Sequence, residues 1–302
     1  MNLLITGAFD WKSEELVILE QMGHRVVFMQ QEKEELPCTA ASIEGVICNG
    51  LFLRHSIEQF TSLRYIQLTS AGFDRVPMDY VKSHGISIFN ARGVYSIPMA
   101  EFVVSGVLEL YKKKRFFYEK QKAHIWEKHR GLQELYGKNV CIVGCGSVGS
   151  ECAKRFRAFG CQVVGVDIVP YQSEGYDRMV NLEGLNSVLP ICDVLVLTLP
   201  LTEETRGIIS KNRLAHMKDG AVLVNIARGA VVDQDGLVET LINQRISAVL
   251  DVFDTEPLES DSALWNLENV IVTPHNSFVG DGNHDRMFAM IYDHLMKVGV
   301  NR

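Results

Sequence analysis

Short apolar runs alternate with longer amphipathic stretches along the whole chain. In the first hundred residues, runs rich in β-branched side chains predict strands at residues 3–6, 25–29, 45–48, 65–69 and 86–89. A second series of six runs follows Asn139, at residues 140–144, 162–167, 194–200, 221–225, 247–253 and 269–274. Strands that alternate with helices are typical of parallel α/β sheets. The pattern therefore predicts an α/β protein with two doubly wound parallel-sheet domains.

Between the two series, the stretch SIPMAEFVVSGVLELYKKKRF predicts a long helix over residues 96–116. Ser96 is expected to cap this helix, and Pro98 is tolerated in its first turn. Residues 116–137 are more polar and less regular, with Trp126 and Leu132 as apolar anchors. We interpret this segment as an arm or linker between the domains.

Composition narrows the class of protein. The 302 residues suggest two domains, and the net charge of −7 argues against a nucleic-acid partner, which requires a basic field. The basic run KKKR at 112–115 is interpreted as a solvated helix face. Seven cysteines without a C-x-x-C pair indicate buried free thiols, and the histidines show no metal-ligand spacing. No signal peptide or membrane span is recognisable, so we expect a cytoplasmic protein with no membrane partner and no metal.

A glycine-rich turn opens the second series. Gly144, Gly146 and Gly149 follow an apolar strand in G-x-G-x-x-G spacing and begin a helix. This context predicts a Rossmann dinucleotide site, in which the glycines permit a tight turn, pyrophosphate approach and close helix packing. The next strand ends in Asp167, whose carboxylate would accept hydrogen bonds from the adenine ribose and repel a 2′-phosphate. NAD is therefore predicted as the cofactor in preference to NADP.

Three strand ends of the second series carry groups suited to acid/base chemistry. Arg228, Glu256 and His275 follow three strands that are expected to be neighbours in such a sheet. Each residue alone has a structural interpretation, as a surface ion pair, a turn cap or a hydrogen-bonded histidine. Together beside a cofactor they predict hydride transfer to or from a small 2-hydroxy or 2-keto acid. His275 would be the general acid/base, Glu256 would orient it, and Arg228 would bind the substrate carboxylate and polarise its carbonyl.

Several motifs resemble those of the D-isomer-specific 2-hydroxyacid dehydrogenase family. The matching segments are LTSAGFDRV, HGISIFNARG, MAEF, VGCGSVGS, LTLPLTEETRGII, VNIARGAVVD, LDVFDTEPL and ALWNLENVIVTPH. The resemblance implies that Arg228, Glu256 and His275 are catalytic and that backbone N–H groups of Ala71 and Gly72 hold the substrate carboxylate. The cofactor contacts that it implies, beyond the glycines, are Ser147, Val148, Asp167, Ile226 and Asp251, with Asp251 near the nicotinamide amide.

The resemblance also implies a domain organisation. Residues 1–97 and 276–302 would form a discontinuous, flavodoxin-like substrate domain, and residues 98–275 the NAD-binding Rossmann domain. The cleft between the domains would close on the substrate. A homodimer is expected, with the region near 100–137 as its arm.

Some positions depart from the family pattern. Asn276, Ser277 and Phe278 follow the histidine, where small or branched apolar residues are usual, and QRISAVLDVF lacks the usual glycine. Tyr95 and Ser96 either line the substrate pocket or only pack and cap. An alternative function is an NAD(H)-sensing interaction protein on the same fold. A formate dehydrogenase is disfavoured, because Glu256 stands where that branch has glutamine.

Overall fold

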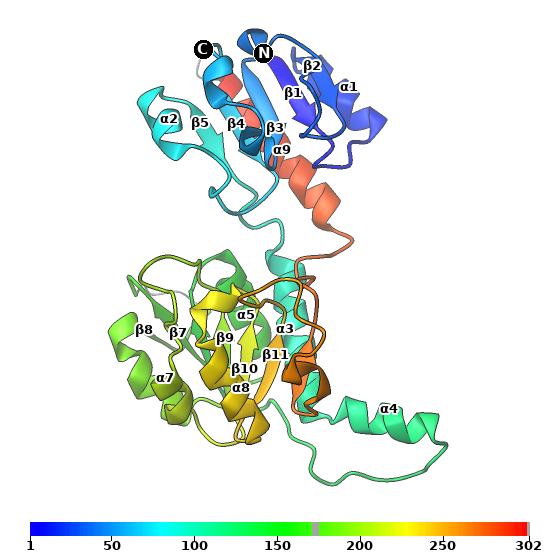
Figure 1. Ribbon diagram of the computed structural model, residues 1–302, viewed down its shortest axis with the longest axis vertical. Helices are drawn as coiled ribbons and strands as arrows, with labels where there is room; N and C mark the ends of the chain where they lie inside the picture. Colours follow the sequence, from blue (N-terminus) through cyan, green and yellow to red (C-terminus); the bar gives the residue numbers. More distant parts are fainter. Residues whose placement is uncertain (171–174, 301–302) are drawn as a thin grey trace. The chain divides into compact units, whose positions relative to one another are not determined.

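The computed structural model describes residues 1–170 and 175–300 of the chain. The chain divides into two compact units, one made of Met1–Tyr95 with Gly280–Arg302 and the other of Ser96–Val279. Each unit contains one parallel β-sheet (Figure 1). The predicted fold class is confirmed by these two sheets.

The first unit has a five-stranded sheet in the order β2-β1-β3-β4-β5, and all its neighbouring strands run parallel. Its strands are β1 (Asn2–Thr6), β2 (Arg25–Met29), β3 (Gly45–Cys48), β4 (Tyr65–Leu68) and β5 (Ser87–Phe89). Its helices are α1 (Ser13–Gln21), α2 (Met78–Ser83) and α9 (Asn283–Val300), with short 3-10 turns η1 (Ala40–Ser42), η2 (Leu51–Leu53) and η3 (Ile57–Gln59).

Two apolar layers hold this sheet. Leu3 and Ile5 of β1 pack with Leu19 of α1 and Ile291 of α9 on one face, while Leu4 packs on the other face. Successive residues of a strand point to opposite faces, so a continuous apolar run buries both sides of the sheet.

The second unit has a seven-stranded sheet in the order β12-β11-β10-β9-β6-β7-β8, again parallel throughout. Its strands are β6 (Asn139–Val143), β7 (Gln162–Asp167), β8 (Arg178–Asn181), β9 (Val194–Leu197), β10 (Val222–Asn225), β11 (Ser247–Leu250) and β12 (Val270–Val272). The strand order reverses between β6 and β9, which is where open α/β sheets bind ligands.

Helices cover both faces of this second sheet. The covering helices are α3 (Ser96–Tyr111), α5 (Ser147–Ala158), α6 (Leu185–Val188), α7 (Lys211–His216) and α8 (Gln234–Ile242), whereas α4 (Lys114–Lys122) has no buried residue. The 3-10 turns of the unit are η4 (Leu182–Gly184), η5 (Leu189–Ile191), η6 (Gly229–Val231) and η7 (Ala263–Asn266). The core on one face joins strand residues to α3 and α5, and the core on the other face joins them to α6, α7 and α8. Gly106 of α3 lets that helix approach closely, because a Cβ there would lie 2.8 Å from Val249 of β11.

The structure differs from the predicted elements at three points. Strand β8 at the sheet edge was not predicted, since only Met179 and Val180 of RMVN are apolar. The predicted helix over 96–116 is wrong at its end, because α3 stops at Tyr111 and Lys113 has a left-handed backbone (φ 50°) before α4 starts. The predicted cap is wrong too, since Ser96 lies inside the first turn and its buried Oγ has no hydrogen-bond partner.

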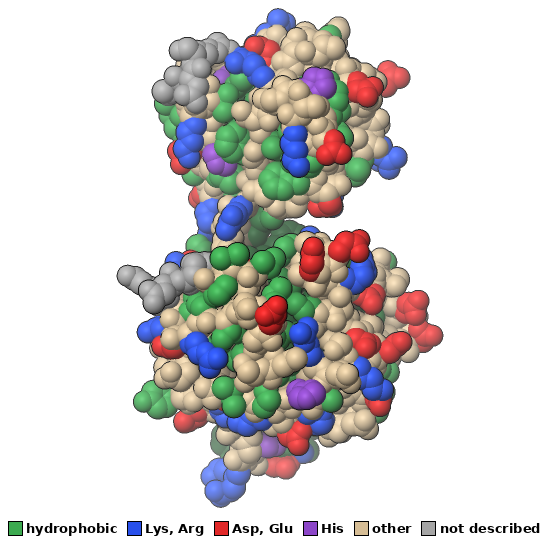
Figure 2. All heavy atoms as spheres, turned by 90° about the vertical axis from the view of Figure 1, so that its left-hand side faces the viewer, with side chains coloured by type: hydrophobic (Ala, Val, Ile, Leu, Met, Phe, Trp, Pro, Cys, Tyr) green, Lys and Arg blue, Asp and Glu red, His purple; other side chains and the backbone are tan. Residues whose placement is uncertain are grey.

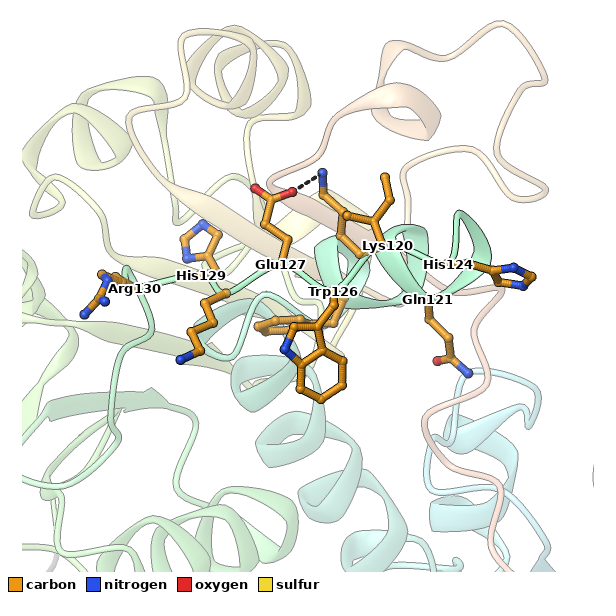
Figure 3. A pocket seen from close by; sticks show the side chains of 10 residues that line it. Lys120, Gln121, His124, Trp126, Glu127, His129 and Arg130 are labelled. Atoms are coloured by element: carbon orange, nitrogen blue, oxygen red, sulfur yellow. Dashed lines mark ion pairs between the residues drawn. The ribbon is translucent and has the colours of Figure 1, made fainter.

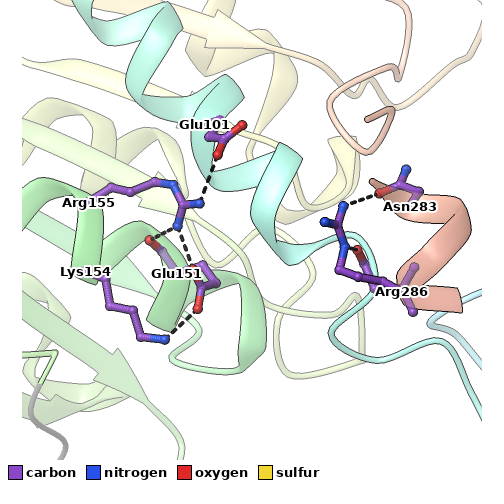
Figure 4. A network of polar contacts seen from close by, with 7 residues as sticks. Glu101, Glu151, Lys154, Arg155, Asn283 and Arg286 are labelled. Atoms are coloured by element: carbon purple, nitrogen blue, oxygen red, sulfur yellow. Dashed lines mark hydrogen bonds and ion pairs between the residues drawn. The ribbon is translucent and has the colours of Figure 1, made fainter. Parts of the chain in front are cut away.

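Polar contacts fasten the helices within each unit (Figure 4). Arg155 of α5 donates to Glu101 of α3 at 3.1 Å and to Glu151 of its own helix at 2.6 Å. In the first unit, Arg286 of α9 donates to the Val94 carbonyl at 2.8 Å and to Asn283 at 2.9 Å. These contacts tie α3 to α5, and α9 to the segment after β5.

On the face shown in Figure 2, Lys and Arg side chains are interspersed with acidic and uncharged ones on both units. Among residues 1–170 and 175–300, the helices are all too short or too polar to span a bilayer.

Candidate active site

The glycine-rich turn follows β6 and leads into α5, as the sequence predicts. Gly144 has φ 95°, and a Cβ there would lie 2.6 Å from the Leu199 backbone nitrogen. A Cβ at Gly149 would lie 2.2 Å from the Gly144 carbonyl oxygen. These two glycines are therefore required by the packing of the turn itself.

Gly146 is different, because a Cβ there would meet nothing within 4 Å. It is the N-cap of α5, whose first residues Ser147 and Val148 are partly exposed. Open space over a helix N-terminus suits an approaching phosphate, since free N–H groups and the helix dipole favour negative charge there. The residues present thus fit a dinucleotide, although the protein itself does not need glycine at this position.

Asp167 ends β7 beside this turn. Its Oδ2 accepts a hydrogen bond from the Cys145 N–H at 2.6 Å, and its Oδ1 accepts one from the Ile168 N–H at 2.7 Å. The carboxylate therefore lies against the glycine-rich turn, with further acceptor capacity on each oxygen. Burial raises the pKa of the Cys145 thiol to about 11, so this thiol stays neutral beneath the turn.

Ile226, which the resemblance implies as a cofactor contact, is a buried residue. Its side chain is buried in the core on the α3 and α5 face of the sheet. The predicted cofactor contact of this residue stays a prediction.

The three predicted catalytic residues follow the carboxyl ends of three adjacent strands. β10 pairs with β11 and β11 pairs with β12, all in parallel. Arg228, Glu256 and His275 follow these strands in turn. Gly229 draws the first two loops together, because a Cβ at Gly229 would lie 2.0 Å from the Phe253 carbonyl carbon.

His275 and Glu256 form a direct pair, with Nδ1 of the imidazole 2.8 Å from Oε2 of the carboxylate. The other oxygen of Glu256 accepts the Phe253 N–H at 3.0 Å. A carboxylate accepts hydrogen bonds, so Nδ1 carries the proton in this pair. Both side chains are partly exposed, at 40% and 37%.

Arg228 is exposed at the end of its strand and has extended backbone geometry. Its Nη1 donates to the Ala227 carbonyl at 2.7 Å. Asn225 fixes the turn beneath it, accepting from the Ala227 N–H at 3.1 Å and donating to the Arg228 carbonyl at 3.0 Å. A guanidinium has five N–H donors in a planar fork, so most of this fork can bind a carboxylate.

Asp251 directly follows β11 and is fully buried. Its carboxylate accepts hydrogen bonds from three groups of the turn that follows β12, namely the Thr273 hydroxyl at 2.6 Å, the Asn276 N–H at 2.8 Å and the Ser277 N–H at 2.9 Å. Sequence reasoning missed this role of Asp251 and that of Asn225. The available signal was a polar residue at the end of an otherwise apolar strand.

Phe278 also lies near His275, with ring centroids 6.3 Å apart and nearly perpendicular planes. The ring is 40% exposed. Phe278, which stands where small or branched apolar residues are usual in the family, therefore places an aromatic ring beside the imidazole.

In the first unit, Ala71 and Gly72 lie in the loop after β4. Asn90 donates to the Ala71 carbonyl at 2.5 Å, and Ser70 donates to the Gly72 carbonyl at 3.3 Å. Their carbonyls are thus held by neighbouring side chains. Their predicted contact with a substrate carboxylate stays a prediction. Tyr95 donates its hydroxyl to the Thr69 carbonyl at 2.6 Å.

A hollow elsewhere in the second unit runs along α4 and the segment after it (Figure 3). Lys120 and Glu127 form an ion pair of 2.6 Å in it, and Trp126 is 97% exposed. Among the described residues, no three His, Cys, Asp or Glu side chains are grouped to hold a metal ion.

The strand order, the glycine-rich turn and the carboxylate after β7 define a nucleotide-binding α/β protein. Residues 104–277 match the family model described as the NAD-binding domain of D-isomer specific 2-hydroxyacid dehydrogenases. The chain belongs to this family. The predicted family, enzyme class and a nicotinamide dinucleotide cofactor are confirmed by this match and by the relatives below, while the preference for NAD over NADP stays a prediction.

The chain is similar to a D-3-phosphoglycerate dehydrogenase of Methanocaldococcus jannaschii, with 33% identity over 99% of this chain. The chain spans 57% of that relative's length. It is 34% identical to a hydroxypyruvate reductase of Thermotoga maritima, covering 72% of each protein. A crystal structure of a family protein from Aeromonas salmonicida has 27% identity and a TM-score of 0.84, covering 99% of this chain and 96% of that one. The named substrates of the first two relatives differ, so they do not identify the substrate of this chain.

Proposed function

We propose that this protein transfers a hydride between NAD(H) and a small D-2-hydroxy acid or its 2-keto acid. The observation that carries the proposal is the pair of His275 and Glu256, 2.8 Å apart, at the strand edge that also bears Arg228. The cofactor supplies or accepts the hydride. The protein must then move a proton and hold an anionic substrate.

His275 moves the proton. In the reductive direction its Nε2 donates to the carbonyl oxygen as this becomes a hydroxyl, and in the oxidative direction the same nitrogen accepts it. Glu256 holds Nδ1–H and stabilises the imidazolium by its negative charge. Because the Phe253 N–H fixes the other oxygen of Glu256, the ring is held in one orientation.

Arg228 binds the anionic substrate. The planar, cationic fork of its guanidinium matches a carboxylate and the adjacent carbonyl oxygen. The same charge stabilises the negative charge that develops on the carbonyl oxygen. The single hydrogen bond to Ala227 leaves the fork anchored at one corner.

Substrate identity is tested by following NADH absorbance with a panel of 2-keto acids. Glyoxylate, hydroxypyruvate, pyruvate and bulkier analogues are compared, with NADH affinity measured separately by fluorescence. We expect reduction of at least one small member. NADH binding without reduction of any member would contradict the proposal and favour the alternative of an NAD(H)-sensing interaction protein.

A further inference from the structure

The turn that carries His275 has an unusual backbone. His275 has φ 51°, the left-handed region that residues with a Cβ rarely adopt. Such a conformation persists only where the surroundings hold it. The groups that hold this turn are therefore candidates for controlling the imidazole.

Asp251 accepts four hydrogen bonds from the residues of this turn. Its carboxylate accepts from Thr273 and Asn276 with Oδ1 and from Ser277 with Oδ2. Its backbone carbonyl accepts the His275 N–H at 2.8 Å. One buried residue thus bonds to the chain on both sides of His275 and to His275 itself.

We propose that Asp251 is a positioning residue for His275, in that its buried carboxylate fixes the left-handed turn and so aims the imidazole at Glu256 and the substrate. The inference rests on the proposed function and goes beyond it. It assigns Asp251 a task distinct from the cofactor contact that family resemblance implies. Fixing the approach of an acid/base group matters, since a misplacement of about 1 Å can cost roughly 100-fold in rate.

The carboxylate is required because both oxygens must accept. In Asp251→Asn, one oxygen becomes an NH2 group, which would face the backbone N–H of either Asn276 or Ser277. Two donors cannot satisfy each other, and a buried unpaired donor is costly. The turn is then expected to relax, and the imidazole moves with it.

The test compares wild type with Asp251→Asn and Thr273→Val. We expect Asp251→Asn to lower kcat by roughly 100-fold and Thr273→Val to lower it less, with a loss of NADH affinity that is much smaller than the loss of kcat. Thr273→Val removes only one donor and so remains informative if Asp251→Asn fails to fold. A wild-type kcat in a folded Asp251→Asn protein would overturn the proposal. A loss of NADH affinity as large as the loss of kcat would overturn it as well.

Asp193→Asn is a matched control. Asp193 is also a buried carboxylate that accepts a backbone N–H, that of Asn139 at 2.9 Å, and it pairs with Lys218 at 2.7 Å. It precedes β9 and so lies at the amino ends of the strands, away from His275. We expect it to lower the melting temperature without lowering kcat. An equal loss of kcat in Asp193→Asn would assign the effect of Asp251→Asn to general destabilisation and overturn the proposal.

A double-variant cycle separates positioning from a merely structural role. If Asp251 acts through His275, Asp251→Asn should have little further effect on the residual rate of His275→Ala. Multiplicative losses would contradict the proposal. Should His275→Ala itself retain full activity, the proposed function fails, whereas an inactive His275→Ala with an unimpaired Asp251→Asn refutes only the positioning role.

Discussion

At the residue scale, Asp167 and Glu256 use their carboxylates differently. Glu256 accepts a hydrogen bond from an imidazole with one oxygen and from a backbone N–H with the other, an arrangement that fixes the orientation of the ring. Asp167 places both oxygens on backbone N–H groups, one of them in the glycine-rich turn. The first arrangement orients the His275 ring, while the second holds a carboxylate against the glycine-rich turn, where we predict the ribose.

Asp167→Ala tests this second arrangement. We expect NADH affinity to fall by about tenfold, because charge-assisted hydrogen bonds are lost, and the preference over NADPH to narrow. Fluorescence titration with both cofactors measures this. Asp177→Ala is the matched control, because Asp177 accepts the Val163 N–H at 2.7 Å near the other end of β7. An unchanged cofactor ratio in Asp167→Ala would refute the ribose assignment.

At the scale of elements, β10 illustrates how the end of a strand determines the position of a side chain. Apolar residues bury the strand, and the side chain of Asn225, its last residue, hydrogen-bonds to the turn that follows. Arg228 leaves that turn with an extended backbone, followed by a glycine that packs on the next loop. The chain therefore passes from the buried end of β10 at Asn225 to the exposed guanidinium of Arg228 within three residues.

Asn225→Ala should loosen that turn. We expect the KM for the 2-keto acid to rise by roughly tenfold, with NADH affinity unchanged, because Arg228 is less well placed. Steady-state kinetics at saturating NADH measures the change. Asn269→Ala is the control, since Asn269, just before β12, donates to the backbone carbonyls of Leu241 and Ile246. Equal effects of the two variants on KM would argue against a role in placing Arg228.

The predictability of these elements follows from their physics. Strands buried on both faces, such as β10, are recognisable from continuous apolar runs. β8 was missed because an edge strand needs fewer apolar residues, and the break at Lys113 was missed because no glycine or proline marks it. The strand ends of Arg228, Glu256 and His275 were predictable from strand order. The hydrogen bonds of Asp251 were not, since they join turns that only the folded sheet brings together.

At the scale of the whole molecule, charge is unevenly distributed along the chain. Residues 112–130 contain eight Lys and Arg and two Glu, a net charge of +6, so the remaining residues carry −13 of the total of −7. The same segment contains the exposed Trp126 and includes α4, which projects from the body of its unit (Figure 1). An apolar, basic arm on an otherwise acidic chain is well suited to contact a second copy.

The predicted homodimer can be tested on this arm. We expect Trp126→Ala to weaken self-association and added salt to weaken it further, because the attraction is partly electrostatic. Sedimentation analysis of wild type and variant over a range of concentrations measures both effects. Tyr136→Ala, at another exposed aromatic residue beyond the basic segment, provides a comparison. A wild-type protein that stays monomeric at high concentration would contradict the prediction.

The central claim is that His275 transfers the proton at the substrate. The most direct measurement is the turnover of His275→Ala with a reducible 2-keto acid, alongside its NADH affinity. General acid/base catalysis contributes about 100- to 10,000-fold, so we expect turnover to fall by at least about 100-fold while NADH binds as in wild type. Normal turnover in a folded His275→Ala protein would contradict the account.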